Sequence, residues 1–307
     1  MDLKSNFILT SVSGKVKAAA LASPYAPINI LVGRWEGRGF NQIWRPFFGA
    51  QDHFLELNET IESLEFDTIP GDIPNRGLLQ ADINLHGIRY LQQIKDAHVV
   101  GNDGLLAGIH VEPGLWVTIP QTTNPQDPPT VARMGDIPHG TTFVAQGVAL
   151  PTLNGAPPFA PVSITPFAIG NPGNLVPFPE STLANASNFR TAAADIPNVT
   201  QAMVDNPNVV LAQAIQGQNI ISTTTLKIST VPLNPPASGG GTSNIAFLQG
   251  APGPNAQSAE IDAIFWVETI EDPHGRKKTQ LQYSQRVLLN FNGLSWPHVS
   301  VATLVKQ

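Results

Sequence analysis

Apolar and polar residues alternate along several stretches of the chain, which is the pattern of strands buried on one face. The strands of the first half are expected, in chain order, over 53–69 (one or two strands), 78–96 (two strands around Gly87), 104–120 (a pair with a bend at Pro113-Gly114) and 131–150. The first half is therefore predicted to be a run of strands.

The last part of the chain, 244–307, repeats the alternation as a meander of strands. Asn292-Gly293 lies between two alternating runs, and this dipeptide strongly indicates a two-residue hairpin turn. The first strand begins near Ile30 and the final one ends near Val305. Both are apolar and would be exposed edges in an open sheet. We therefore expect them to lie side by side and to close an antiparallel β-barrel.

The middle of the chain has a different texture. Residues 151–181 are rich in proline, which removes ladder hydrogen bonds. One helix is predicted, with Asn206 as N-cap, Pro207 at its first position and Gly217 just past its end. Residues 219–231 are β-branched and favour a strand. The predicted organisation is a lead-in over 1–29 and one barrel domain over 30–307, with 150–242 as an insertion or lid.

Composition supports an all-β fold and narrows the chemistry. Only 13% of the 307 residues are charged, and there are 28 prolines and 26 glycines. The net charge of −6, without a basic tract, argues against a nucleic-acid partner. The absence of cysteine removes disulfides, thiolate metal sites and cysteine nucleophiles. No apolar run approaches the roughly 20 residues of a membrane helix, and no secretory signal is recognisable, so a cytoplasmic protein without a membrane partner is expected.

Three motifs resemble a known family. "GRWEGRGFNQIWRP" (33–46) resembles the first strand of calycin barrels, in which a tryptophan plugs one end. "HVEPGLWVTIP" (110–120) and "WPHVSVATLVKQ" (296–307) are similar to strands of the nitrobindin-like haem-binding barrels, which are also related to fatty-acid-binding proteins. The resemblance covers 30–146 and 243–307. It implies a calycin-type antiparallel barrel with a proline-rich insertion that contains a short helix.

The same resemblance implies a cofactor and a chemistry. Members of the family hold b-type haem noncovalently, and the "P-H" of the final strand supplies the axial ligand, which here is His298. The implied activity is ferric haem chemistry with nitric oxide and isomerisation of peroxynitrite, so the chain is a candidate peroxynitrite isomerase. The residues allow this reading, because neutral imidazole is a good iron ligand and the chain lacks cysteine.

His298 also has a simpler interpretation. Trp296, His298, Ser300 and Ala302 share one strand face by the two-residue period, but the opposite face is equally apolar. Periodicity alone leaves open which face points inward. The two hypotheses are a haem ligand, with Trp296 beside the cofactor, and a core or interface histidine that has a hydrogen-bond partner.

A second candidate group lies on 110–120. His110, Glu112 and Trp116 share a face, and a carboxylate two residues from an imidazole can hold it in one tautomer, as in an acid–base or distal pair. The alternative is that this polar face meets solvent. Arg133 is among the arginines that could bind haem propionates, although most such arginines are plain surface charges. His139 is expected to be a loop residue.

A rival hypothesis comes from another class of function. Calycin barrels also hold fatty acids, terpenoids and similar apolar molecules, and a few act as isomerases. The expected partner is therefore a hydrophobic small molecule or haem, and a homodimer is allowed. Under the rival hypothesis, His110 and Glu112 are acid–base candidates or surface residues.

Overall fold

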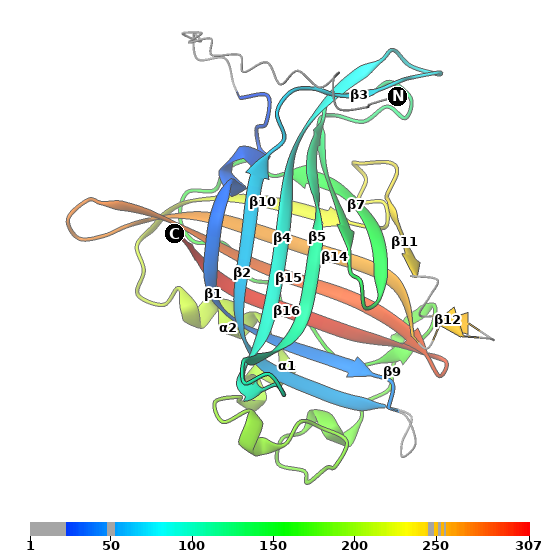
Figure 1. The fold of residues 1–307 in the computed structure, drawn as a ribbon, viewed down its shortest axis with the longest axis vertical. Coiled ribbons are helices and arrows are strands. Elements are labelled where there is room, and N and C mark those ends of the chain that lie inside the picture. The colour runs from blue at the N-terminus through cyan, green and yellow to red at the C-terminus, as the bar shows by residue number, and fades with distance from the viewer. Residues whose placement is uncertain (1–22, 48–52, 245–248, 251–252, 255) are drawn as a thin grey trace, which may run out of the picture.

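The computed structural model describes residues 23–47, 53–244, 249–250, 253–254 and 256–307. Ten long antiparallel strands form the wall of a barrel: β1 (Gly33–Arg45), β2 (Phe54–Thr68), β4 (Ile83–Val100), β5 (Leu106–Ile119), β6 (Thr130–Asp136), β7 (Thr141–Ala149), β10 (Ile220–Ser229), β14 (Gln257–Glu271), β15 (Lys277–Phe291) and β16 (Leu294–Lys306). They are paired in this order (Figure 1). The all-β prediction is confirmed.

The barrel closes through its first and last strands. β1 pairs with β16 in an antiparallel register that sets Glu36 opposite Val305 and Ile43 opposite His298. The expected pairing of the terminal strands is confirmed, although the first strand starts at Gly33, because Ile28–Leu31 form a 3₁₀ helix. Asn292 and Gly293 both have positive φ between β15 and β16, as a tight hairpin turn requires.

Two predicted breaks do not occur. β4 runs through Gly87 and β5 runs through Pro113-Gly114, so each predicted pair of strands is one long strand. Residues 53–69 likewise form the single strand β2. At Gly114 a Cβ atom would lie 2.6 Å from the ring of Tyr90, its partner on the neighbouring strand β4, so this glycine makes room for the Tyr90 ring instead of forming a bend.

Short elements decorate the barrel. The short strands are β3 (Ile73–Asn75), β8 (Phe167–Ala168), β9 (Asn171–Leu175), β11 (Gly241–Asn244), β12 (Gln249–Gly250) and β13 (Gly253–Pro254). The helices are α1 (Gln201–Asp205), α2 (Asn208–Ala214) and 3₁₀ turns at Pro179–Ser181 and Ala193–Asp195. The predicted helix is therefore present as α2, shorter than expected and with Pro207 as its N-cap, while α1 was not predicted.

One end of the barrel is filled by an apolar core. Trp35 is fully buried there and donates from Nε1 to the Leu31 carbonyl at 2.6 Å, so the 3₁₀ helix and the tryptophan close this end together. Lys306 lies over the Trp35 ring at 5.3 Å. Arg286 does not take part in this contact and instead pairs with Glu260 and Asp262.

The proline-rich segment packs on the outside of the barrel. A second apolar core joins the outward side chains of β1 and β16 to residues of this segment, including Ile164, Ile196, Val204 and Leu211. Figure 1 shows α1 and α2 outside the barrel wall. Because β10 lies within the predicted range 150–242 and is a wall strand, the segment outside the wall is 150–219. It covers the wall and contributes no residue to the cavity lining described below.

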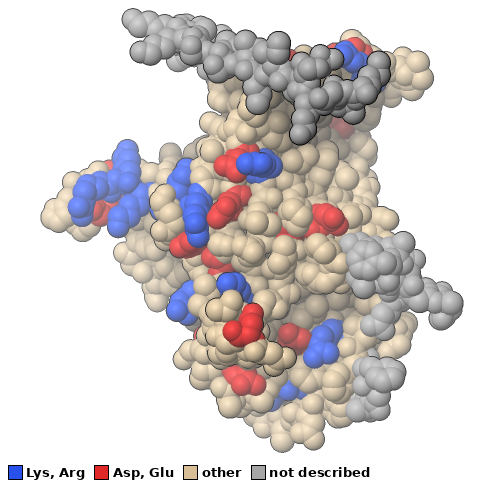
Figure 2. All heavy atoms as spheres, viewed as in Figure 1, with Lys and Arg blue, Asp and Glu red and all other residues tan. Residues whose placement is uncertain are grey.

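The surface shown in Figure 2 carries basic and acidic side chains interspersed. The basic group at its left lies on the β14–β15 hairpin, which carries Arg276 in its turn and Lys277 and Lys278 at the start of β15. In the described part of the chain, no helix is long and apolar enough to cross a lipid bilayer.

Candidate functional site: a cavity with a polar floor

The half of the barrel opposite Trp35 contains a cavity of about 580 Å³. Its apolar wall comes mainly from aliphatic side chains of five elements: Ile43, Ile94, Ile109, Ile137, Val287 and Leu289. Its polar lining includes amide, hydroxyl and imidazole groups: Asn41, Gln92, His110, His139, Thr141, Tyr283, Gln285, His298 and Ser300. A cavity of this size and mixed lining falls within the range of small-molecule sites.

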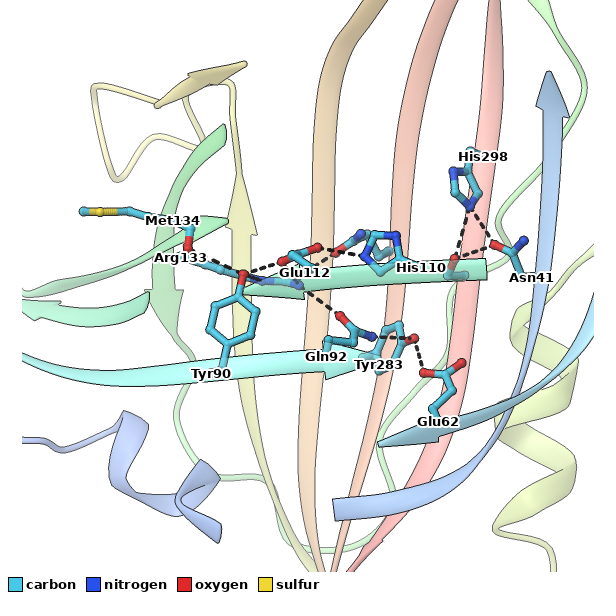
Figure 3. Close-up of polar contacts among 12 residues, drawn as sticks. Asn41, Glu62, Tyr90, Gln92, His110, Glu112, Arg133, Met134, Tyr283 and His298 are labelled. Carbon is cyan, nitrogen blue, oxygen red and sulfur yellow. Dashed lines mark hydrogen bonds and ion pairs between the residues drawn. The ribbon is translucent and has the colours of Figure 1, made fainter. Parts of the chain in front are cut away.

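Beneath the cavity lies a buried ion pair. Glu112 on β5 and Arg133 on β6 approach to 2.5 Å between Oε1 and Nη2, and both side chains are almost inaccessible to solvent. Tyr90 also donates to Oε1 of Glu112, while Arg133 Nε donates to the Tyr90 oxygen at 3.0 Å. Figure 3 shows this group. Burial alone would raise the pKa of Glu112, but Arg133 and His110 outweigh it and lower the pKa to about 2. The carboxylate therefore stays ionised.

Arg133 also orders the polar floor. It donates to Oε1 of Gln285 at 2.7 Å and to Oε1 of Gln92 at 3.3 Å. Gln92 then donates to the Tyr283 hydroxyl at 3.0 Å, and Tyr283 donates to Glu62 at 2.5 Å. Burial raises the pKa values of both Tyr283 and Glu62. One fixed guanidinium thus sets the orientation of the amide groups along the cavity floor.

Two histidines lie at the side of this floor. His110 Nε2 is 3.3 Å from Oε2 of Glu112, and the His110 side chain is 11% exposed. His139 is exposed in the turn between β6 and β7, and its ring meets that of His110 edge-on with centroids 5.2 Å apart. Burial lowers the pKa of His139, and the neighbouring His110 lowers it further. The polar face of β5 therefore points into the barrel, and the alternative that it meets solvent is wrong.

His298 lies on the opposite side of the cavity and has a fixed partner. Its Nε2 is 2.6 Å from Oδ1 of Asn41, which also accepts from Ser300 at 2.7 Å. Asn41 Nδ2 donates to Asn58, and Asn58 Nδ2 donates to the carboxylate of Asp96 at 2.8 Å. The carboxylate of Asp96 can only accept, so Asn58 turns its NH₂ group toward Asp96 and its oxygen toward Asn41. Asn41 then donates its NH₂ group to Asn58 and presents its own oxygen to His298. His298 Nε2 therefore carries a proton.

The charge state of His298 follows from its surroundings. Burial lowers its pKa to about 3, and His110 and His139 contribute in the same direction. The ring is neutral near pH 7, with a proton on Nε2 and the lone pair on Nδ1. In this structure His298 lines the cavity and has Asn41 as its hydrogen-bond partner.

Haem would place a specific demand on its axial histidine. An axial ligand must offer a nitrogen lone pair to the iron, whereas Nε2 of His298 is used as a donor to Asn41. Nδ1 is bonded to Cγ, the ring atom that carries Cβ, so it lies nearer to the backbone of β16 than Nε2 does. In this arrangement the residues do not fit an axial haem site. In addition, no group of three or more histidine, aspartate or glutamate side chains among the described residues could hold a metal ion.

The six residues proposed from sequence fall into four places. His298 and His110 line the cavity, whereas Glu112 and Arg133 lie directly beneath it. Trp116 packs in the inner core against Phe265, with ring centroids 5.2 Å apart. Trp296 packs in the outer core and stacks on Phe291. Neither tryptophan is part of the cavity lining.

Sequence reasoning missed several polar members of the site. Asn41, Asn58, Glu62, Gln92 and Gln285 point inward at the two-residue period of their strands. Their only signal was a polar residue in phase with apolar ones, as at Glu62 with Leu64 and Phe66. His139 is a turn residue, as expected, but that turn reaches the cavity.

Comparisons with known proteins add little to this picture. A search of solved structures gives a match to the crystal structure of Rv2717c from M. tuberculosis, with a TM-score of 0.44 and 14% sequence identity, covering 94% of this chain and 99% of that chain. No protein-family model matches the chain, and no curated protein does. The barrel assignment therefore rests on the strand pairing itself.

Proposed function

We propose that this protein binds a small amphipathic molecule inside its barrel. The observation that carries the proposal is the cavity of about 580 Å³, which combines an aliphatic wall with a preorganised polar floor. The aliphatic wall favours an apolar body, since each square ångström of apolar surface removed from water contributes about 25 cal/mol. The expected ligand has an extended apolar body, as fatty acids and terpenoids have.

The polar floor favours a ligand with one hydrogen-bonding end. Oε1 of Gln285 accepts a hydrogen bond from Arg133, so the Nε2 group of Gln285 is left as a donor in the cavity. His298 uses Nε2 for Asn41, which leaves Nδ1 as an acceptor. A carbonyl or hydroxyl group matches this combination. Such preorganised groups fix the orientation of a ligand more than they add to its affinity.

Binding of 8-anilinonaphthalene-1-sulfonate tests the proposal. Its fluorescence should rise saturably with the wild-type protein. Val287→Phe places a larger ring in the cavity wall and should weaken binding at least 10-fold. Val111→Phe, a matched change at a 42% exposed position on the outer face of β5, should leave binding unchanged. Absence of saturable binding, or equal binding by both variants, would overturn the proposal.

Haem bound through His298, with the nitric oxide and peroxynitrite chemistry that it implies, is the competing occupant. Haem binding would require Asn41 to release Nε2 of His298. The hydrogen bonds that run from Asp96 through Asn58 to Asn41 oppose this, because they hold Oδ1 of Asn41 toward the histidine. Hemin titration separates the two occupants. A Soret band that forms at one hemin per chain and is lost in His298→Ala would favour haem. An amphipathic ligand predicts equal, weak hemin uptake by both proteins.

A further inference from the structure

The cavity wall contains an imidazole–carboxylate pair that ligand binding alone does not require. His110 and Glu112 are two residues apart on β5 and point to the same side, with Nε2 of His110 3.3 Å from Oε2 of Glu112. The other carboxylate oxygen, Oε1, already accepts from Arg133 and Tyr90. Glu112 is therefore satisfied as an ion-pair partner without His110. The Glu112–Arg133 ion pair does not need the His110 imidazole, which lines the cavity beside it.

The pair fixes the tautomer of His110. An ionised carboxylate only accepts hydrogen bonds, so Nε2 of His110 is the donor, and in the neutral ring the lone pair is on Nδ1. The carboxylate also stabilises the positive charge that the ring would gain on accepting a proton. An imidazole oriented by a buried carboxylate, next to a cavity that holds a ligand, is the arrangement of a general base.

His139 contacts His110 from the β6–β7 turn. Its ring meets His110 edge-on, and its side chain is exposed at the rim of the cavity. Other charged or titratable groups also face His110: Glu112 from its own strand, Glu62 from β2, Arg133 from β6 and His298 from β16. Arg133 and Glu112 neutralise each other, so proton uptake by His110 would leave a single new charge near the carboxylate.

We propose that His110 is a catalytic base that removes a proton from a carbon next to the carbonyl group of the bound ligand, and that His139 exchanges this proton with solvent. This inference rests on the proposed binding function. In the step, the C–H bond breaks, the proton bonds to Nδ1 of His110, and the electron pair moves into the enolate. Return of the proton to another carbon of the same conjugated system completes an isomerisation that needs no oxidant or second reactant.

Exchange of the α-protons of 2-tetralone in D₂O, followed by proton NMR, tests the proposal. This probe has an apolar body and an acidic C–H group beside a carbonyl. The wild-type protein should accelerate exchange saturably, with a rate that rises with pD and then levels off. His110→Gln should lower the protein-dependent rate about 100-fold and abolish that pD profile. His274→Gln, a matched change in the exposed β14–β15 turn, should behave as wild type.

A second variant keeps the test decisive if glutamine disturbs the fold. Added imidazole should restore exchange in His110→Ala, since it can enter the space left by the ring. Equal rates in the wild type and in the His110 variants, or no rescue in a folded His110→Ala protein, would overturn the proposal. Binding of 8-anilinonaphthalene-1-sulfonate by the same samples separates the failures. Retained binding without His110-dependent exchange refutes only the base, whereas loss of binding by the wild type refutes the binding function and the base together.

Discussion

Glu268 should make the stability of this protein fall as the pH rises. Its side chain on β14 is fully buried in the wall, away from the cavity lining. Oε2 accepts from Gln280 at 2.6 Å, and Oε1 has no hydrogen-bond partner among the described residues. Burial raises the pKa of Glu268 from 4.5 to about 7, and the bond from Gln280 offsets only part of that effect. Glu268→Gln removes the ionisation and keeps the shape of the side chain.

The size of the effect follows from the displaced pKa. A rise from 4.5 to about 7 corresponds to about 3 kcal/mol, since one pKa unit is about 1.4 kcal/mol. The native state binds this proton more tightly than the unfolded state does. The stabilisation is therefore complete below about pH 4.5 and is lost as the pH rises through 7. Glu268→Gln should change the free energy of unfolding by less than about 1 kcal/mol at pH 5 and raise it by about 3 kcal/mol at pH 8.5.

Urea unfolding of the wild type and Glu268→Gln at both pH values measures this difference. Glu271→Gln, at a partly exposed position on the same strand, is the matched control and should show no such pH dependence. An equal change in unfolding free energy at pH 5 and pH 8.5 for Glu268→Gln would refute the reasoning. So would a stabilisation that appears only at pH 5.

Three further predictions concern the barrel and its polar groups. Deleting 296–307 should abolish soluble folding, because β1 and β15 lose their shared partner; cooperative melting of the truncated protein would contradict barrel closure. Glu112→Gln should cost about 3–5 kcal/mol by leaving Arg133 buried without its counter-charge, and urea unfolding that shows less than about 1 kcal/mol would contradict this. His298→Ala should cost about 0.5–1.5 kcal/mol by removing one of the two donors to Oδ1 of Asn41, the other being Ser300; thermal melting can show this, and an unchanged midpoint would count against the His298–Asn41 hydrogen bond.

The barrel could be predicted because its signals are local or topological. The alternation over 53–69 indicates a strand with one buried face. The apolar character of the first and last strands indicates that neither is an exposed edge, and the two do pair. The lengths of β4 and β5 could not be predicted, since Gly87 and Gly114 are turn residues by local preference. In the folded chain, both lie within ladders that long-range pairing holds together. Tertiary pairing thus overrides the local turn signal.

The site was only partly predictable for a similar reason. The two-residue spacing of His110 and Glu112 is visible in the sequence, and their contact is present. The contact of Glu112 with Arg133, and that of His298 with Asn41, joins residues that are 21 and 257 positions apart. Nothing in the local pattern reports such partners. The proline-rich segment has no regular spacing of apolar residues that would indicate a buried face. Its packing on the outer wall therefore could not be predicted either.

The most direct test of the central claim is a crystal structure of the protein grown with 8-anilinonaphthalene-1-sulfonate. The account predicts density for the aromatic rings among Ile94, Val287 and Leu289, inside the closed barrel and above the Arg133–Glu112 pair. Rings found only on the outer wall, or a barrel interior filled by side chains so that no ligand can enter, would contradict it.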